Sequence, residues 1–148
     1  MEKLEVLQKS TLFEMLSQSE LELLAELSRP RRYAAGEVIF EEGDLGDSLF
    51  VLMNGEVDVL HKDGKGEAKV LATLQPPEFF GEMSLIDKEF RSATVRARKD
   101  ATMLHLTAEN LATFRKNYKD GFAFLVINIA RVLSNRLRET NGRLRQQA

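Results

Sequence analysis

The middle of the chain, residues 33–106, divides its apolar residues into short runs separated by glycine. Runs such as SLFVLMN and EVDVL are too short for a helix with a buried face, and apolar residues alternate within them. Alternation with a period of two is typical of a strand, whereas a helix repeats about every 3.6 residues. Asp63-Gly64 stands between two such runs and is a hairpin-turn signal. The pattern predicts about eight short strands wound into a jelly-roll-like β-roll.

Helical spacing precedes this region, so residues 1–30 are expected to form N-terminal helices. Leu21, Leu24 and Ala25 recur on one helical face, and Pro30 is expected to end the last of these helices. Two pairs match the capping-box pattern at a helix N-terminus, Thr11 with Glu14 and Ser19 with Glu22.

Helical spacing returns after the strands, over residues 107–148. Thr107 is a plausible N-cap, and a longer helix is expected from about Gly121, with Gly142 interrupting its end. Apolar residues in this helix follow a heptad seam, which predicts a homodimer through the C-terminal helix unless the seam packs on the chain's own roll. The seam residues are Val126, Ala130, Leu133, Leu137, Thr140 and Leu144.

Together these segments predict an α+β, mainly β fold, and the length of 148 residues favours a single domain over residues 1–148. The end helices have apolar faces that a β-roll can bury. No apolar run is long enough to span a bilayer and the N-terminus lacks the apolar core of a signal peptide, so no membrane partner is expected.

Charge and composition exclude several kinds of site. The net charge of −2 gives no electrostatic footprint for nucleic acid. The absence of cysteine excludes disulfides and thiolate chemistry and fits a cytoplasmic protein. A metal-dependent β-roll enzyme needs converging histidines, but His61 and His105 form no HxH pair, so both are interpreted as structural and no metal or cofactor is expected.

One stretch, GEMSLIDKEFRSATV over residues 81–95, contains the candidate site. Gly81 allows a close backbone approach, and the planar fork of Arg91 suits a phosphate. Glu82 would repel an anion, but a carboxylate accepts hydrogen bonds from sugar hydroxyls. One arginine matches about one negative charge, and no Walker motif is present for a triphosphate. These residues favour a ribose carrying a single phosphodiester charge.

This stretch resembles the phosphate-binding cassette of cyclic nucleotide-binding domains, of the form FGE-x-[SA]-L…R-[STA]-A. Residues 36–59 also resemble the family's strand-and-glycine signature, and the end helices its flanking helices. The resemblance implies that Glu82 binds the ribose 2′-hydroxyl and Arg91 the cyclic phosphate. It also implies ligand contacts from Phe80, Gly81, Met83, Ser84, Ser92, Ala93, Val70 and Leu71.

Two departures from the family pattern concern the loops around the cassette. Pro77-Glu78 stands where the family has a Gly-Asp turn, and Lys88-Glu89-Phe90 stands where a glycine and a proline usually precede the arginine. The spacing from Gly81 to Arg91 is kept. The resemblance also implies that the C-terminal helix folds over the base, with Arg136 and Leu137 near it.

The expected function is therefore a non-enzymatic regulatory module that senses cyclic AMP, with cyclic GMP as the second choice, and signals by moving its C-terminal helix. A constitutive dimerisation module with a vestigial pocket is the alternative, and a non-metal β-roll enzyme is a third. The sequence leaves open the choice of nucleotide, the downstream partner, and whether the chain is part of a longer protein.

Overall fold

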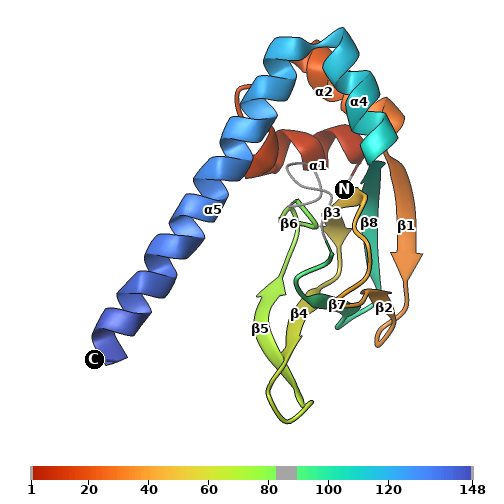
Figure 1. Cartoon of the computed structure of the whole chain (residues 1–148). Helices are drawn as coiled ribbons and strands as arrows, with labels where there is room; N and C mark the ends of the chain where they lie inside the picture. Colours follow the sequence, from red (N-terminus) through yellow and green to blue (C-terminus); the bar gives the residue numbers. More distant parts are fainter. Residues whose placement is uncertain (1, 83–89, 148) are drawn as a thin grey trace.

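A computed structural model describes residues 2–82 and 90–147 as two four-stranded sheets with helices packed at one end (Figure 1). The helices are α1 (Lys3–Lys9), α2 (Gln18–Leu27), α4 (Ala108–Asn117) and α5 (Lys119–Gln147), with a 3-10 turn η1 (Thr11–Phe13). The strands are β1 (Arg29–Tyr33), β2 (Val38–Phe40), β3 (Ser48–Asn54), β4 (Val57–Lys62), β5 (Ala68–Leu74), β6 (Phe79–Phe80), β7 (Thr94–Ala97) and β8 (Ala101–Thr107).

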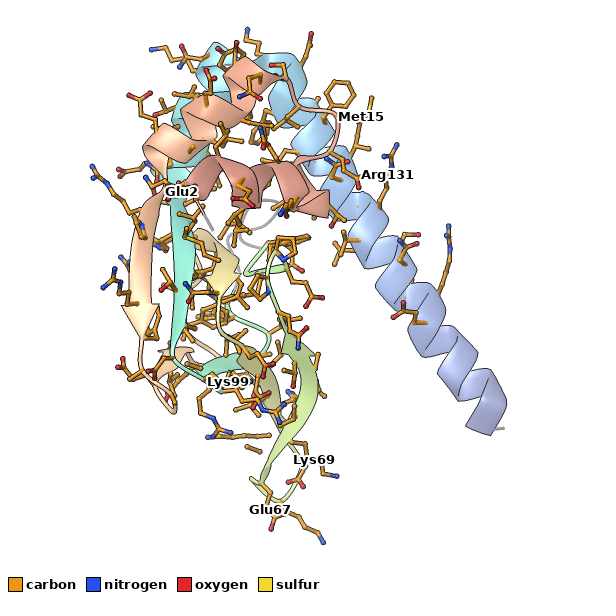
Figure 2. The ribbon with its side chains drawn as sticks, turned by 180° about the vertical axis from the view of Figure 1, so that it is seen from behind. Glu2, Met15, Glu67, Lys69, Lys99 and Arg131 are labelled. Carbon is orange, nitrogen blue, oxygen red and sulfur yellow. The ribbon has the colours of Figure 1, made fainter. Side chains whose placement is uncertain are left out.

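The strands form two antiparallel sheets, which confirms the predicted β-roll and its flanking helices. Sheet A has the order β1-β8-β3-β6 and sheet B the order β2-β7-β4-β5. The Asp63-Gly64 hairpin joins β4 to β5 as expected, and its tip lies at the opposite end of the molecule from Met15 (Figure 2).

The two central strands of sheet A, β8 and β3, are buried on both faces, because successive side chains alternate between two cores. Leu49 and Val51 pack with the helices, whereas Phe50 and Leu52 pack between the two sheets. β8 does the same, with Leu104 on the helical side. Sheet A therefore lies between the helical layer and the interior of the roll and packs against both.

The N-terminal boundaries differ from the prediction. The capping box that forms is Ser17 with Glu20, not Thr11 with Glu14 or Ser19 with Glu22. Several serine and glutamate pairs in this segment have the required spacing, and the pattern alone does not choose among them. The start at Ser17 places Leu21 and Leu24 in the core.

The roll also begins earlier than the predicted residue 33. Helix α2 ends at Leu27, and Pro30 lies inside β1 instead of ending a helix. Proline lacks a backbone N–H and is tolerated on an edge strand, and β1 is an edge of sheet A. The predicted helical segment 1–30 therefore contains the first residues of the sheet.

The C-terminal helices follow the prediction more closely. Thr107 caps α4, and its side chain accepts a hydrogen bond from the N–H of Asn110. Helix α5 begins at Lys119, slightly before Gly121, and its helical backbone continues through Gly142. Among the described residues, no helix is both long and apolar enough to cross a membrane.

Helix α5 is attached to the rest of the chain over its first half. Leu125 and Ile129 are fully buried in the helical core. Between them, the buried Asn128 side chain donates hydrogen bonds to the carbonyls of Leu12 and Glu14, at 2.9 and 2.8 Å. The second half projects away from the roll (Figure 1).

The predicted heptad seam is mostly not covered by the chain itself. Val126 is 37% exposed and Leu137 is 62% exposed, whereas Leu133 packs partly against the helical core. Thr140 and Leu144 have side chains outside the described part of the structure. Among the seam residues with described side chains, Leu133 alone packs against the chain's own core, and dimerisation stays a prediction.

We expect Asn128→Ala to lower the free energy of unfolding by about 1–3 kcal/mol, because two backbone carbonyls lose a donor. Denaturant unfolding with an unchanged m-value would measure this. The control Asn135→Ala removes the same amide from an exposed position of α5 and should change the free energy by no more than about 0.5 kcal/mol. Equal effects of the two variants would contradict the anchoring role.

Candidate functional site

Arg91 is only 8% exposed although it carries a charge. Its Nη1 donates a 3.4 Å hydrogen bond to the Gly81 carbonyl, and its Nη2 donates a 3.2 Å hydrogen bond to Ser48 Oγ. The Phe40 ring covers the guanidinium, with its centroid 4.1 Å from Cζ. The guanidinium is therefore contacted by neutral groups from three separate segments.

The backbone of Arg91 is fixed by the turn between β2 and β3. Its N–H donates to the Asp44 carbonyl at 2.6 Å, and its own carbonyl accepts from the Gly43 N–H at 2.9 Å. An isolated bridge between Leu45 and Phe90 extends this pairing. The cassette therefore ends in a short ladder whose partner is the glycine-rich signature identified in the sequence.

Gly81 is required by both its conformation and its surroundings. Its φ of +81° lies in the left-handed region, which favours glycine. A Cβ there would lie 2.7 Å from Arg91 Nη1 and 2.9 Å from the Ser48 carbonyl oxygen. Gly81 thus permits the close approach of β6, β3 and Arg91.

The chain forms a closed turn before β6, where Pro77-Glu78 replaces the Gly-Asp of the family pattern. Pro76 and Pro77 lie in a turn closed by a 2.8 Å hydrogen bond from the Glu78 N–H to the Gln75 carbonyl. The Glu78 carboxylate accepts a further hydrogen bond from the Gln75 N–H at 2.7 Å. The departure from the family pattern is therefore compatible with a closed turn leading into the site.

Acidic residues surround the buried cation. Burial lowers the pKa of Arg91 from its usual value, while the charges of Asp47, Asp44 and Glu82 act in the opposite direction. Glu82 is itself only 5% exposed. The two residues singled out in the sequence, Glu82 and Arg91, are thus a buried carboxylate and a buried guanidinium.

A cluster of aromatic rings lies beneath the guanidinium. Phe50 and Phe80 stack at 5.1 Å, and Phe40 contacts both at 6.0 and 5.9 Å. His105 continues the cluster, 4.8 Å from Phe50. His105 is on the opposite face of β8 from its neighbours in the helical core, as expected from the alternation.

Both histidines have surroundings that fit structural roles. Burial lowers the pKa of His105, and the charges of Arg31 and Arg91 lower it further, while Asp47 opposes them. His61 lies 2.7 Å from the Glu42 carboxylate. Within residues 2–82 and 90–147, no group of three or more histidines and carboxylates could hold a metal ion.

The predicted site residues fall into three groups. Gly81, Glu82 and Arg91 come together as a buried cluster, and the Phe80 ring supports it from the interior. Ser92 and Ala93 follow Arg91 directly and are at least partly exposed. The remaining apolar positions are exposed, with Val70 at 54%, Leu71 at 62% and Leu137 at 62%.

Three of the predicted residues are not described by the structure. Met83 and Ser84 lie outside the described residues, as does the side chain of Arg136. Sequence reasoning missed other residues that contact or surround Arg91, namely Phe40, Asp44, Asp47 and Ser48. They belong to residues 36–59, which the resemblance marked as a signature without assigning it contacts.

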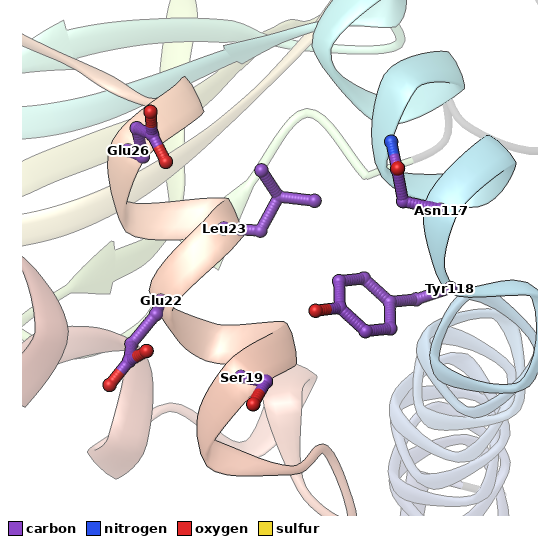
Figure 3. Close-up of a pocket in the computed structure, with 6 residues that line it drawn as sticks. All are labelled: Ser19, Glu22, Leu23, Glu26, Asn117 and Tyr118. Carbon is purple, nitrogen blue, oxygen red and sulfur yellow. The ribbon is translucent and has the colours of Figure 1, made fainter.

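A separate groove of about 490 Å³ lies between α2 and α4 (Figure 3). Its described lining residues include two carboxylates and no cation, so its chemistry differs from that of the Arg91 cluster. Figure 3 shows the Tyr118 side chain extending across the gap toward α2. The lining residues are Ser19, Glu22, Leu23, Glu26, Asn117 and Tyr118.

We expect Gly81→Ala to destabilise the protein by several kcal/mol, because it adds a steric clash to an unfavourable φ. The control Gly66→Ala has φ +80° in open space, beside Glu67 at the hairpin tip (Figure 2), and should cost only about 1–2 kcal/mol. Thermal and denaturant unfolding of both variants would compare them. Equal losses would mean that the close approach at Gly81 does not matter.

Comparisons with known proteins identify the family to which the chain belongs. The chain is 37% identical over 133 residues to the cyclic AMP receptor protein of Thermus thermophilus, covering 89% of this chain and 59% of that protein. A cyclic nucleotide-binding domain from Methylobacillus flagellatus has a TM-score of 0.85 and 26% identity, with 99% of this chain and 83% of that chain covered.

A more distant structure shares the fold. The regulatory domain of protein kinase A from Toxoplasma gondii, crystallised with cyclic AMP, has a TM-score of 0.72 and 24% identity, covering 76% of this chain and 43% of that chain. The family description "Cyclic nucleotide-binding domain" matches residues 30–118, from β1 through the site to the end of α4. The chain belongs to the cyclic nucleotide-binding domain family.

Proposed function

We propose that this chain is a regulatory module that binds a cyclic nucleotide, with cyclic AMP as the preferred ligand. The observation that carries the proposal is the buried cluster of Gly81, Glu82 and Arg91. The module acts by binding and not by catalysis, and no metal or cofactor takes part.

The proposed phosphate site is centred on Arg91. Its guanidinium is a planar fork that matches phosphate oxygens. In the structure its acceptors include two neutral oxygens, one at the long distance of 3.4 Å. Hydrogen bonds to a charged phosphate are shorter and roughly twice as strong as neutral ones. Arg91 would therefore form stronger hydrogen bonds with a phosphodiester than it forms with these two oxygens.

Glu82 is proposed to bind the ribose. A carboxylate only accepts hydrogen bonds, and a 2′-hydroxyl can donate one. The charge of Glu82 acts on Arg91, which supports a position beside the phosphate site. We propose that Ser92 and Ala93 add backbone contacts to the phosphate, together with Ser84.

The base is proposed to lie against apolar residues. Val70 and Leu71 are exposed on β5, an edge strand of sheet B whose first five residues are all exposed. Burying them under a purine would gain about 25 cal/mol for each Å² of apolar surface covered. The preference for cyclic AMP is supported by the likeness to the cyclic AMP receptor protein of Thermus thermophilus.

Helix α5 is proposed to be the moving element. Its first half is anchored by Asn128, while its second half lies away from the strands (Figure 1). We propose that it folds over the base, bringing Arg136 and Leu137 to the ligand. A ligand shifts such an equilibrium only by its difference in affinity between the two positions. Contacts from Arg136 and Leu137 would supply that difference.

The context of the module is also a proposal. The chain spans 59% of the length of the Thermus thermophilus relative. We propose that it is a cytoplasmic regulator whose residues 1–148 form one domain, and that it passes its signal to another domain or partner. Neither nucleic acid nor membrane is proposed as a ligand of this domain.

We expect Arg91→Leu to weaken cyclic AMP binding by about 30- to 5,000-fold, the range for truncating one partner of a desolvated charge pair. Isothermal titration calorimetry would measure the affinity, and thermal unfolding would check that the variant folds. Arg98→Leu removes an exposed arginine at the end of the neighbouring strand β7 and should leave the affinity unchanged.

The same titrations separate the alternatives. Wild-type protein is titrated with cyclic AMP, cyclic GMP and 2′-deoxy cyclic AMP, and weaker binding of the deoxy ligand supports the role of Glu82. Binding of none of them would leave the dimerisation module with a vestigial pocket as the better assignment. Unchanged affinity in Arg91→Leu would place the phosphate elsewhere.

We further propose a homodimer through the exposed face of α5. The seam residues Val126 and Leu137 are apolar and 37% and 62% exposed, and Ile127 beside them is 45% exposed. Large apolar residues gathered on an exposed surface are typical of an interaction site. The heptad spacing of Val126 and Leu137 fits a second copy of the same helix.

We expect Leu137→Glu to raise the dimer dissociation constant at least tenfold, because burying an unpaired carboxylate is costly. Sedimentation velocity over a concentration series would measure the dissociation constant. Asn135→Glu adds the same charge at an exposed position outside the seam and should have little effect. If the wild-type protein stays monomeric at high concentration, the proposed homodimer is wrong.

A further inference from the structure

Phe40 lies against the guanidinium that the proposed function assigns to the phosphate. The Arg91 Cζ atom is 4.1 Å from the centroid of the Phe40 ring, well within the distance for a cation–π interaction. Arg91 is 8% exposed, so little water competes for the cation. The attraction between a ring and a cation is stronger where water is excluded.

The position of Phe40 is itself fixed from behind. Phe50 and Phe80 stack with an interplanar angle of 10°, and Phe40 is tilted against both of them. The two rings belong to the core between the sheets. Phe40 therefore packs between the stacked rings of Phe50 and Phe80 and the guanidinium of Arg91.

Further supports of Arg91 come from the residues that follow Phe40. The Asp44 carbonyl accepts a hydrogen bond from the Arg91 backbone N–H at 2.6 Å, and Ser48 Oγ accepts one from Nη2 at 3.2 Å. Residues 40–48 thus contact Arg91 in three ways. Asp44 binds its backbone, Phe40 covers one face of its guanidinium, and Ser48 binds Nη2.

We propose that Phe40 is a positioning residue for the phosphate site. The hydrogen bonds of a guanidinium lie in its plane. A ring on the face of Arg91 therefore fixes that plane without consuming a donor, and turns an edge of the fork toward the ligand. This inference rests on the proposed binding of a cyclic nucleotide.

An aromatic support also suits the charge of the ligand. Asp44, Asp47 and Glu82 already act on Arg91 electrostatically. A further carboxylate would compete with the phosphate for the cation, whereas a neutral ring stabilises the cation without cancelling its charge. Phe40 thus holds the Arg91 side chain in position without adding a negative charge that would compete with the phosphate.

The decisive experiment varies the electron density of the ring at nearly constant shape. Phe40 is replaced by 4-fluoro-, 3,5-difluoro- and 3,4,5-trifluorophenylalanine, and cyclic AMP affinity is measured by calorimetry. We expect a stepwise loss, reaching about 2- to 30-fold overall. The same series at Phe50, whose ring contacts are with Phe40, Phe80 and His105, should give no such trend.

Conventional variants complete the test. Phe40→Leu should weaken cyclic AMP binding by a similar factor, whereas Phe40→Tyr should bind nearly as tightly as the wild type. Thermal unfolding would check that both variants fold. If wild-type protein binds cyclic AMP and the fluorinated series at position 40 is flat, the role of Phe40 is overturned while the proposed function stands.

A measurement without ligand separates the two proposals. The Arg91 guanidinium NMR signals, assigned by their absence in Arg91→Leu, should show a ring-current shift that disappears in Phe40→Leu and persists in Phe50→Leu. If the wild type binds no cyclic nucleotide, the proposed function fails, and this spectrum still decides whether Phe40 holds Arg91. Identical Arg91 signals in wild type and Phe40→Leu overturn the inference.

Discussion

Burial of a charged guanidinium is the constraint on which the site depends. Removing such an ion from water costs several kcal/mol even after relaxation of the protein, so Arg91 needs compensating contacts on several sides. Phe40, Ser48 and the Gly81 carbonyl supply them, and nearby carboxylates favour the charged form. These groups come from distant parts of the chain. Their convergence requires the β2–β3 turn and the end of β6 to meet around residue 91.

Strand β3 connects this site to the helices. Ser48 contacts Arg91, the next side chain Leu49 packs in the helical core, and Phe50 returns to the aromatic cluster. Leu125 and Ile129 of α5 belong to the same helical core as Leu49. A movement of Ser48 on ligand binding would therefore act on the layer that anchors α5. If α5 moves as proposed, this shared strand is the route by which the ligand site would act on it.

Much of this architecture could be predicted because alternation and glycine spacing are local signals. The roll, the flanking helices and the Thr107 cap follow from residues close in sequence, and so does the proximity of Glu82 to Arg91. Helix boundaries near residue 17 could not, since several pairs satisfy the same capping pattern. The roles of Phe40 and Ser48 depend on contacts between segments far apart in the chain, which spacing does not encode.

The proposed roles of helix α5 use different faces of the helix. Leu125 and Ile129 face the chain's own core, while Val126 is partly exposed. Successive residues of a helix point about 100° apart, so intrachain anchoring and pairing with a second copy use different sides of the same turns. Leu133 is the last residue of the described helix that packs on the helical core, and Leu137 is exposed. Among the seam residues with described side chains, Leu137 is the one that the proposed lid and the proposed dimer would both use, so ligand binding and dimer packing would be coupled through the second half of α5.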